Sequence, residues 1–310
     1  MKFFFSLSRC GATLLCLATL SALTRAQDLF VASIFSDEVY RFNGTTGTNM
    51  GVFASGMDGP YGIDFGPDGN LYVCSLFAGP KTISKYNGTT GASLGTFVNL
   101  GGANPIDIRF RADGLYVTIG GSTGGIQRYD KNTGAALGAF TPLINDPIGV
   151  DWNTSGDLFV SSFNQNKIFK YNGTTGALIG TFATASLSSP YGMRFGPDGN
   201  LYVANVGSDV ITRYNGTTGA LMGTFASGGG LNDPTGILFG GDGHLYVASG
   251  NTNQILRYNG TTGAFMDVFA TAPNLNGPVF MAFAPVPEPT SIAVLSIGAL
   301  ALLRRRRSSK

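Results

Sequence analysis

Apolar and polar residues alternate with a period of two along short segments of this chain, and turn-forming residues separate the segments. Such alternation is typical of β-strands that bury one face. Residues 61–65 predict a first strand, residues 67–70 a tight turn and residues 71–73 a second strand. Residues 167–171 predict a third strand and residues 178–182 a fourth, with a turn at residues 172–176 between them. No helix is needed between residues 27 and 284, so we expect an all-β fold.

The strand pattern repeats six times along the chain. An aromatic residue followed by Asn-Gly-Thr-Thr-Gly, or by a close variant of it, occurs at Phe42, Tyr86, Tyr129, Tyr171, Tyr214 and Tyr258, with spacings of 44, 43, 42, 43 and 44 residues. A period of this length is typical of propeller blades that contain four strands each. The repeat therefore predicts a six-bladed β-propeller with four-stranded antiparallel blades.

The two ends of the repeat array predict how the ring closes. A first strand led by proline occurs at Pro60, Pro105, Pro147, Pro190, Pro234 and Pro278. No second strand follows Phe283, whereas the segment at residues 29–31 resembles a second strand that lacks a first one. Pairing the two fragments removes both exposed strand edges. We expect the N-terminal strands to join the C-terminal blade.

Composition and charge narrow the possible functions. Glycine occupies 46 of the 310 positions, and only 12% of the residues are charged, which suits short strands and turns better than helices. The formal net charge of +2 comes from the two ends, because residues 27–287 contain 12 Lys or Arg against 17 Asp or Glu. The predicted propeller thus lacks the basic surface of a nucleic-acid-binding protein.

The N-terminus has the pattern of a secretory signal peptide. A basic residue at Lys2 precedes a mostly apolar stretch at residues 10–23, and Ala26 provides a small residue at the expected cleavage point. We therefore expect residues 1–26 to be a helical signal peptide that Sec-type export machinery recognises. Cleavage there would leave Cys74 as the single cysteine, which we expect to be a small buried residue.

The C-terminus has a pattern of three parts. Pro287, Glu288 and Pro289 precede a mostly apolar segment at residues 292–303, and four arginines follow at Arg304, Arg305, Arg306 and Arg307. The apolar segment is shorter than the roughly 20 residues that span a bilayer. These residues resemble the PEP-CTERM sorting signal of Gram-negative bacteria. The resemblance implies that residues 285–310 are a sorting segment with a short membrane helix, and that an exosortase removes this segment.

That resemblance also implies a location. The chain would be membrane-inserted before processing, and its body would then reach the cell surface or the extracellular matrix. The alternative is a plain C-terminal membrane anchor, which fits the apolar segment but does not explain the Pro-Glu-Pro motif.

The repeats, with Pro-x-Gly-Ile, Asp-Gly-Asn-Leu-Tyr-Val and Arg-Tyr, resemble NHL-type and gluconolactonase-like six-bladed propellers over residues 28–284. The gluconolactonase-like enzymes hold a divalent metal with acidic and amide side chains near the starts of their inner strands. The matching positions here are Tyr61, Ile106, Ile148, Tyr191, Thr235 and Val279. A hard cation requires several oxygen ligands, so we expect no metal and no other cofactor.

Candidate catalytic residues are also scarce. Virginiamycin-lyase-like propellers use a histidine as general base, but the single histidine here, His244, occupies a turn position equivalent to Asn70 and Asn200. No second histidine is present for a Ser-His-Asp triad.

The Asn-Gly-Thr repeats fit an N-glycosylation pattern, yet we interpret them as hairpin turns in which Asn-Gly supplies positive φ angles. The Asp-Gly-Asn segments are too short for calcium loops, and we interpret them as turns.

The loops between second and third strands vary most and could form a binding rim. We select the aromatic, amide and acidic residues there, which are types that stack on sugars and bind hydroxyl groups: Phe35, Phe77, Phe163, Asn164, Asn166, Asp209, Asn251 and Asn253. The alternative is that the polar residues cap turns and the aromatic residues pack between blades.

A second group of polar residues occupies one equivalent position in the first strands. Asp64, Arg109, Asp151 and Arg194 alternate in sign in successive blades, and Leu238 and Ala282 follow. We predict inter-blade ion pairs between Asp64 and Arg109 and between Asp151 and Arg194, with the two apolar residues packed together. The alternative is a ligand-binding channel lined by unpaired charges.

These observations predict an exported, non-enzymatic binding or structural module, with exopolysaccharide or a surface protein as the partner class considered. One alternative is a propeller lyase or lactonase that acts on a carbohydrate or a lactone. Another is a purely structural component of the matrix.

Overall fold

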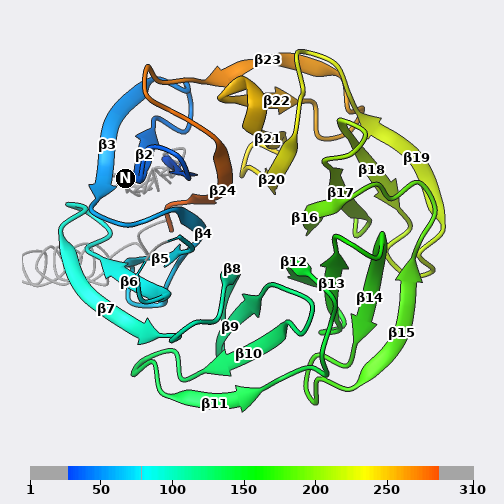
Figure 1. The fold of residues 1–310 in the computed structure, drawn as a ribbon. Coiled ribbons are helices and arrows are strands. Elements are labelled where there is room, and N and C mark those ends of the chain that lie inside the picture. The colour runs from blue at the N-terminus through cyan, green and yellow to red at the C-terminus, as the bar shows by residue number, and fades with distance from the viewer. Residues whose placement is uncertain (1–26, 78, 286–310) are drawn as a thin grey trace, which may run out of the picture.

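A computed structural model describes residues 27–77 and 79–285. These residues form a ring of six four-stranded antiparallel sheets, which are the blades of a propeller (Figure 1). The predicted fold class is therefore confirmed. The predictions for the signal peptide, the apolar segment at residues 292–303 and the arginine cluster lie outside the described residues. Among the described residues, no helix is long and apolar enough to cross a membrane.

Each blade consists of four strands ordered outward from the axis of the ring (Figure 1). The first strands are β4 (Pro60–Phe65), β8 (Pro105–Arg111), β12 (Pro147–Trp152), β16 (Pro190–Phe195), β20 (Pro234–Phe239) and β24 (Pro278–Phe283). The second strands are β1 (Leu29–Ser33), β5 (Leu71–Ser75), β9 (Gly114–Ile119), β13 (Leu158–Ser162), β17 (Leu201–Asn205) and β21 (Leu245–Ser249).

The outer half of each blade is equally regular. The third strands are β2 (Glu38–Phe42), β6 (Thr82–Tyr86), β10 (Gly125–Tyr129), β14 (Lys167–Tyr171), β18 (Val210–Tyr214) and β22 (Gln254–Tyr258). The fourth strands are β3 (Asn49–Ser55), β7 (Ser93–Asn99), β11 (Ala136–Ala139), β15 (Leu178–Ala183), β19 (Leu221–Ala226) and β23 (Phe265–Ala270). A 3-10 turn, η1 (Gly250–Thr252), follows β21.

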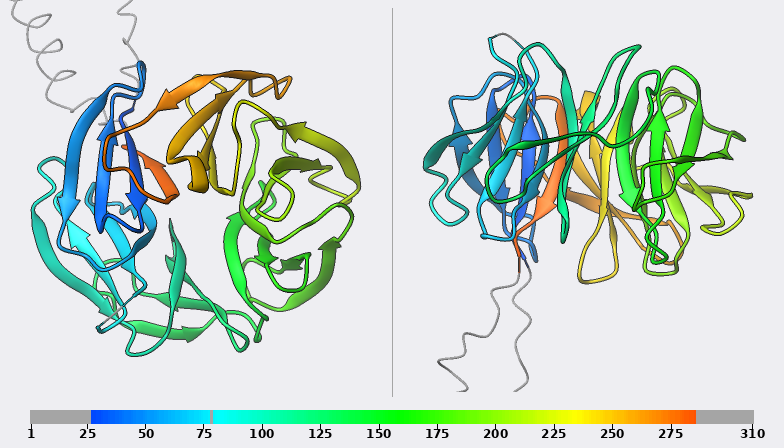
Figure 2. Two further views of the ribbon diagram at one scale, coloured as in Figure 1. Left: turned by 45° about the horizontal axis from the view of Figure 1, so that its top comes forward. Right: turned by 90° about the horizontal axis from the view of Figure 1, so that it is seen from below.

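The ring closes as the sequence predicts. Strand β24 pairs with β1, with Leu29 opposite Phe283, so one blade combines the two ends of the array. The amide of Ala284 donates a hydrogen bond to the carbonyl of Asp28 at 2.9 Å, which continues this pairing beyond the strands. Both ends of the described chain therefore lie side by side on one face of the ring (Figure 2).

The ring has two different faces, which we name by their connections. The turn face carries the first-to-second-strand turns, the third-to-fourth-strand turns and both ends of the described chain. The loop face carries the loops between second and third strands and the connections from each fourth strand to the next blade.

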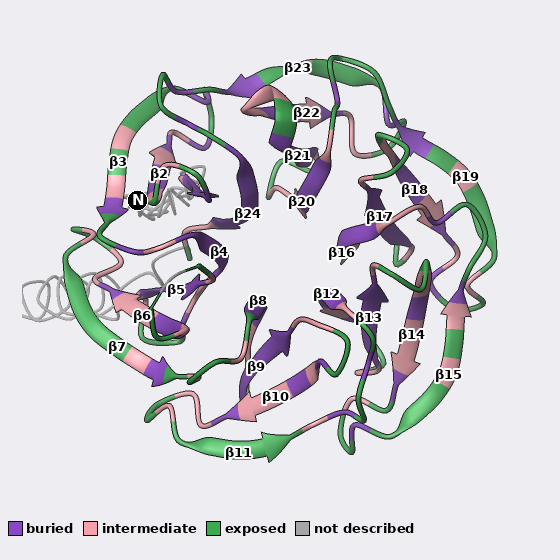
Figure 3. Ribbon diagram, in the orientation of Figure 1, coloured by how far each residue is buried: buried purple, intermediate pink, exposed green. Residues whose placement is uncertain are grey.

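A repeated aromatic sandwich holds neighbouring blades together. Tyr72 of β5 lies between Phe97 of the same blade and Phe110 of the next, with ring centroids 4.9 and 4.6 Å away. Each of the other five blades places an equivalent aromatic ring between two others; the central rings are Phe30, Tyr116, Phe159, Tyr202 and Tyr246. Each such aromatic contact contributes about 0.5–1.5 kcal/mol beyond the burial of its area. The second strands are fully buried as a result, whereas the fourth strands are mostly exposed (Figure 3).

The Asn-Gly-Thr-Thr-Gly segments form turns, but the physical reason differs from the prediction. The Asn43 side-chain oxygen accepts hydrogen bonds from the amides of Thr45 and Thr46, both at 3.0 Å. The positive φ angle, 69°, belongs to Gly47 and not to Asn43 or Gly44. A Cβ atom on Gly44 would collide with the carbonyl oxygen of Gln27. The first glycine therefore allows close packing, and the last glycine allows the left-handed backbone.

Candidate functional site

An aromatic cleft opens on the loop face, where the closing blade meets the first strands of other blades. This loop-face cleft has a volume of about 140 Å³. Its walls include the side chains of Phe35, Tyr61, Tyr191, Asp233, Thr235 and Asn251. Four different blades contribute these residues, so only the closed ring creates the cleft.

Aromatic side chains meet across the ring at the floor of the cleft. Tyr61 and Tyr191 come from β4 and β16, which lie on opposite sides of the ring, and their ring centroids are 6.4 Å apart (Figure 1). Phe280 of β24 lies 6.0 Å from Tyr61 and 6.1 Å from Tyr191. Phe280 occupies the position at which four other blades have a glycine, such as Gly62, whose Cβ would collide with the next blade. A large side chain at this one position therefore fills the centre of the ring.

The cleft contains polar groups that the fold leaves available. The carboxylate of Asp233 accepts no hydrogen bond from the described residues, although the Asp233 backbone amide donates one to Asp209. Burial, and then the negative charge of Asp209, raise the pKa of Asp233. Burial, and then the charges of Asp233 and Asp146, also raise the pKa of Tyr61. The Tyr61 hydroxyl therefore stays protonated and neutral.

Four of the eight predicted rim residues lie in or next to the cleft. Phe35 and Asn251 line it directly. Phe77 stacks on Phe35 at 6.3 Å, and the two rings remain 41% and 65% exposed. Phe163 packs edge-on against Tyr191 at 6.1 Å. Two of these residues therefore line the cleft, and the exposed rings of Phe35 and Phe77 lie on the surface beside it.

Three other predicted rim residues fasten neighbouring blades together instead. The side-chain oxygens of Asn166, Asp209 and Asn253 accept hydrogen bonds from the amides of the residues that precede Pro190, Pro234 and Pro278, at 2.7, 2.7 and 2.8 Å. Each of the three has a positive φ angle between 50° and 56°. Asn and Asp tolerate this left-handed conformation better than most residues, which explains their presence. The remaining residue, Asn164, is exposed on its loop.

The prediction of ion pairs between blades is wrong, because the two carboxylates bind backbone amides of the neighbouring blade and not arginines. Asp64 reaches the next blade, but its Oδ2 accepts a hydrogen bond from the backbone amide of Phe110 at 2.9 Å. Asp151 binds the amide of Phe195 in the same way, at 2.7 Å. Among the described residues, neither carboxylate has an ion pair with Arg109 or Arg194. The carboxylates lie opposite the peptide groups of the neighbouring strand, and those amides satisfy them.

The two arginines bind backbone carbonyls, and Arg109 also contacts an aspartate of its own strand. Arg109 Nη1 contacts Asp107 Oδ1 at 3.2 Å and donates a hydrogen bond to the carbonyl of Ile108 at 2.8 Å. Arg194 Nη1 donates to the carbonyl of Met193 at 2.6 Å and to the carbonyl of Val150 in the neighbouring blade at 3.4 Å. The two predicted apolar partners also separate, because Ala282 and half-buried Leu238 pack into different parts of the core.

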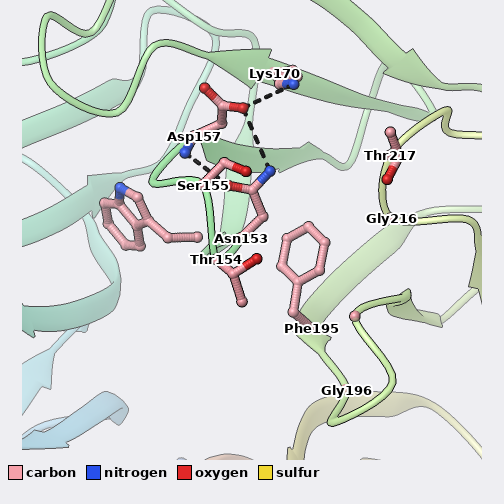
Figure 4. A pocket seen from close by; sticks show the side chains of 11 residues that line it. Asn153, Thr154, Ser155, Asp157, Lys170, Phe195, Gly196, Gly216 and Thr217 are labelled. Carbon is pink, nitrogen blue, oxygen red and sulfur yellow. Dashed lines mark hydrogen bonds and ion pairs between the residues drawn. The ribbon is translucent and has the colours of Figure 1, made fainter.

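A larger cavity, about 320 Å³, lies on the turn face between two blades (Figure 4). Its polar groups bind one another: Lys170 Nζ lies 2.9 Å from Asp157 Oδ2, and the Asp157 amide donates to Asn153 Oδ1 at 2.8 Å. An equivalent groove of about 290 Å³ recurs at Phe65 and Phe110. Because this groove repeats with the blades, and Lys170 and Asp157 of the larger cavity are paired with each other, we assign both to blade packing.

The other chemically reactive residues do not converge. His244 lies in the turn before β21, where its amide donates to Asp242 at 3.1 Å. Cys74 is buried and free, as predicted, and burial raises the pKa of its thiol. The Asp-Gly-Asn segments form turns: in one of them, Asp68 Oδ1 accepts a hydrogen bond from the Asn70 amide at 3.1 Å. In the part of the chain that the structure describes, no three His, Cys, Asp or Glu side chains are close enough to hold a metal ion.

Sequence reasoning did not select Tyr61, Tyr191 and Asp233 as binding residues. In the sequence, Tyr61 and Tyr191 stand out only as positions at which a metal ligand would be expected, and Asp233 lies outside the loops that vary in length. A signal was present, because the residue after the repeated proline varies between Tyr, Ile, Thr and Val in a repeat that is otherwise uniform.

Comparison with known proteins identifies the C-terminal motif and the fold. Residues 285–307 match the PEP-CTERM protein-sorting motif. The motif implies that the protein is exported and that an exosortase sorts it to the cell surface. No curated protein matches the chain.

Two solved structures illustrate the similarity in fold. A chain in the crystal structure of a nidogen/laminin complex has a TM-score of 0.71 at 16% identity, covering 84% of this chain and 98% of that one. A protein of unknown function from Bacteroides caccae has a TM-score of 0.68 at 13% identity, covering 84% and 100% of the two chains. At these identities the similarity concerns the fold alone.

Proposed function

We propose that this protein is a non-enzymatic binding module of the cell surface or extracellular matrix, and that its loop-face cleft binds saccharide units of an exopolysaccharide. The observation that carries the proposal is the meeting of Phe35, Tyr61 and Tyr191 with Asp233 and Asn251 around one cleft. Aromatic rings stack on the apolar faces of sugars, and carboxylate and amide groups bind sugar hydroxyls. Saccharide sites of this kind need no metal or nucleophile.

The position of the chain ends supports the same use of the cleft. The sorting motif begins at residue 285, immediately after Ala284, which is bound to Asp28 on the turn face. A chain held at a membrane through this motif would have its turn face toward the membrane. The loop-face cleft would then point outward, toward the matrix.

The alternative of a lyase or lactonase finds less support in the cleft. A general base must lie within hydrogen-bonding reach of the proton that it removes. The only histidine of the chain is on the turn face, and Asp233 is the only carboxylate among the residues that line the cleft. Metal-dependent turnover of lactones or acidic polysaccharides by the purified protein would overturn the non-enzymatic proposal.

Affinity electrophoresis in gels that contain the exopolysaccharide of the producing cells tests the proposal. We expect the polysaccharide to retard the protein, and we expect Phe35→Ala and Tyr191→Ala to weaken binding about tenfold each, or about 1.4 kcal/mol. Leu143→Ala is the matched control, because Leu143 is an exposed apolar residue of the same face that does not line the cleft. Thermal unfolding of each variant verifies that the ring is intact. Equal retardation of all four proteins would contradict a role for the cleft.

A further inference from the structure

The charge of the propeller is distributed unequally between its two faces. On the turn face, eight carboxylates accompany eight basic residues: Asp28, Asp68, Asp113, Asp130, Asp157, Asp198, Asp242 and Asp267 with Arg41, Lys85, Arg111, Arg128, Lys131, Lys170, Arg213 and Arg257. On the loop face, six carboxylates accompany two lysines: Asp37, Glu38, Asp58, Asp146, Asp209 and Asp233 with Lys81 and Lys167. Nearly all of the net negative charge of the described residues therefore lies on the loop face.

The two lysines of the loop face do not neutralise the cleft. Lys81 donates hydrogen bonds to the carbonyls of Leu76 and Phe77 in its own loop. Lys167 begins β14 and is not among the residues that line the cleft. Among the described residues that line it, the cleft has one carboxylate, Asp233, and no basic side chain. Its electrostatic potential therefore favours a cation and disfavours an anionic sugar.

The aromatic walls favour a cation for a second reason. Tyr61, Tyr191 and Phe35 line the cleft, and aromatic rings attract a nearby ammonium group through the negative charge of their π systems. A carboxylate next to aromatic faces is a chemical environment suited to a protonated amine. The volume of about 140 Å³ is well below the roughly 300–1,000 Å³ of sites for drug-sized ligands, so it suits one sugar unit or headgroup.

We infer that the loop-face cleft recognises an amino sugar with a free, protonated amino group, such as a hexosamine unit of a partly deacetylated polysaccharide. This inference rests on the proposed function and specifies its ligand. Asp233 accepts hydrogen bonds from the ammonium group, while Tyr61, Tyr191 and Phe35 surround the sugar ring. Asn251 lies at the edge of the cleft, where its amide already donates to Asn232 at 2.9 Å.

Two hexasaccharides that differ only in the amino group test this inference. We would measure binding of a glucosamine hexamer and of the matching N-acetylglucosamine hexamer to the full chain purified from the producing cells, by isothermal titration calorimetry near pH 6. We expect the free amine to bind at least about tenfold more tightly, with an affinity that falls as salt is added. We expect Asp233→Asn to reduce this preference to about twofold or less.

Asp58→Asn is the matched control, because it removes the same charge from the same face outside the cleft. This variant should keep the tenfold preference. Equal binding of both hexamers by the wild-type protein, or an equal preference in Asp233→Asn and Asp58→Asn, would overturn the inference and leave saccharide binding intact. Binding of the native exopolysaccharide without binding of either hexamer would do the same. If neither the hexamers nor the native polysaccharide bind, the proposed function itself is wrong.

Discussion

Two kinds of aspartate in this propeller respond to pH in opposite directions. Asp64 and Asp151 lie on inner strands, where burial raises the pKa of each to about 6 despite the hydrogen bonds from Phe110 and Phe195. Asp68 lies in a turn, where burial raises its pKa but hydrogen bonds from Lys85 and Asn70 outweigh burial and lower the pKa to about 2. The same residue type therefore stabilises the fold in its neutral form at one place and in its charged form at another.

The inner aspartates make the protein less stable as pH rises from about 4 to 6. In this range the unfolded chain, with Asp pKa values near 3.9, binds fewer protons than the folded chain. The contribution of each group is fully present below about pH 4 and is lost above about pH 6, and it is on the order of 2–3 kcal/mol. Urea unfolding at pH 4, 5, 6 and 7 measures this loss in the free energy of unfolding.

In that experiment, Asp64→Asn should remove the contribution of Asp64 to this pH dependence. The free energy of unfolding of the variant should therefore fall less than that of the wild type between pH 4 and 6. Asp68→Asn is the control. The lowered pKa of Asp68 means that this residue loses its contribution to stability as pH falls below about 4, and not as pH rises from 4 to 6. If the difference in free energy of unfolding between the wild type and Asp64→Asn is the same at pH 4 and pH 6, this account is contradicted.

At the scale of strands, β8 departs from the repeat and needs its own stabilisation. Four first strands have a glycine two residues after the proline, such as Gly62 and Gly149, and a Cβ there would collide with the backbone of the next blade. In β8 this position is Asp107, which is fully buried and accepts hydrogen bonds from the amides of Ile108 and Val150 at 2.9 and 3.4 Å. Arg109 provides the nearby positive charge.

Removing Arg109 should therefore destabilise the fold more than removing both charges. Arg109→Leu leaves Asp107 buried without its cation, and we expect a loss of about 3–5 kcal/mol. The double variant Asp107→Asn/Arg109→Leu removes both charges, and we expect it to recover at least about 1–2 kcal/mol of this loss. Guanidinium unfolding of the two variants and of Asp107→Asn completes the double-mutant cycle. A double variant that is less stable than Arg109→Leu would show that the two residues stabilise the strand independently.

On the scale of the whole molecule, ring closure brings the two chain ends together on the turn face and leaves the cleft on the opposite face. The pairing of β24 with β1 joins residues that are more than 240 positions apart in the sequence. If the C-terminal segment holds the protein at a membrane before sorting, this geometry fixes which face points outward.

Surface labelling can test that orientation. In cells in which removal of the C-terminal segment is blocked, Leu143→Cys on the loop face should react with a bulky maleimide faster than Asn132→Cys on the turn face. Cys74 is buried and gives a low background. After the segment is removed, the two rates should become similar. Faster labelling of the turn face in the uncleaved protein would contradict the expected orientation.

The all-β class, the six blades and the manner of closure can all be predicted from the sequence. These depend on local alternation, on turn residues such as Gly47, and on the period at which they recur, all of which are visible in the linear chain. Which side chains converge depends instead on how the strands pack in three dimensions. Tyr61 and Tyr191 are 130 residues apart and meet because a closed ring of six blades sets them opposite each other. Asp64 binds the Phe110 amide and not the Arg109 guanidinium because the register between neighbouring blades, which no local pattern encodes, places a peptide group at that point.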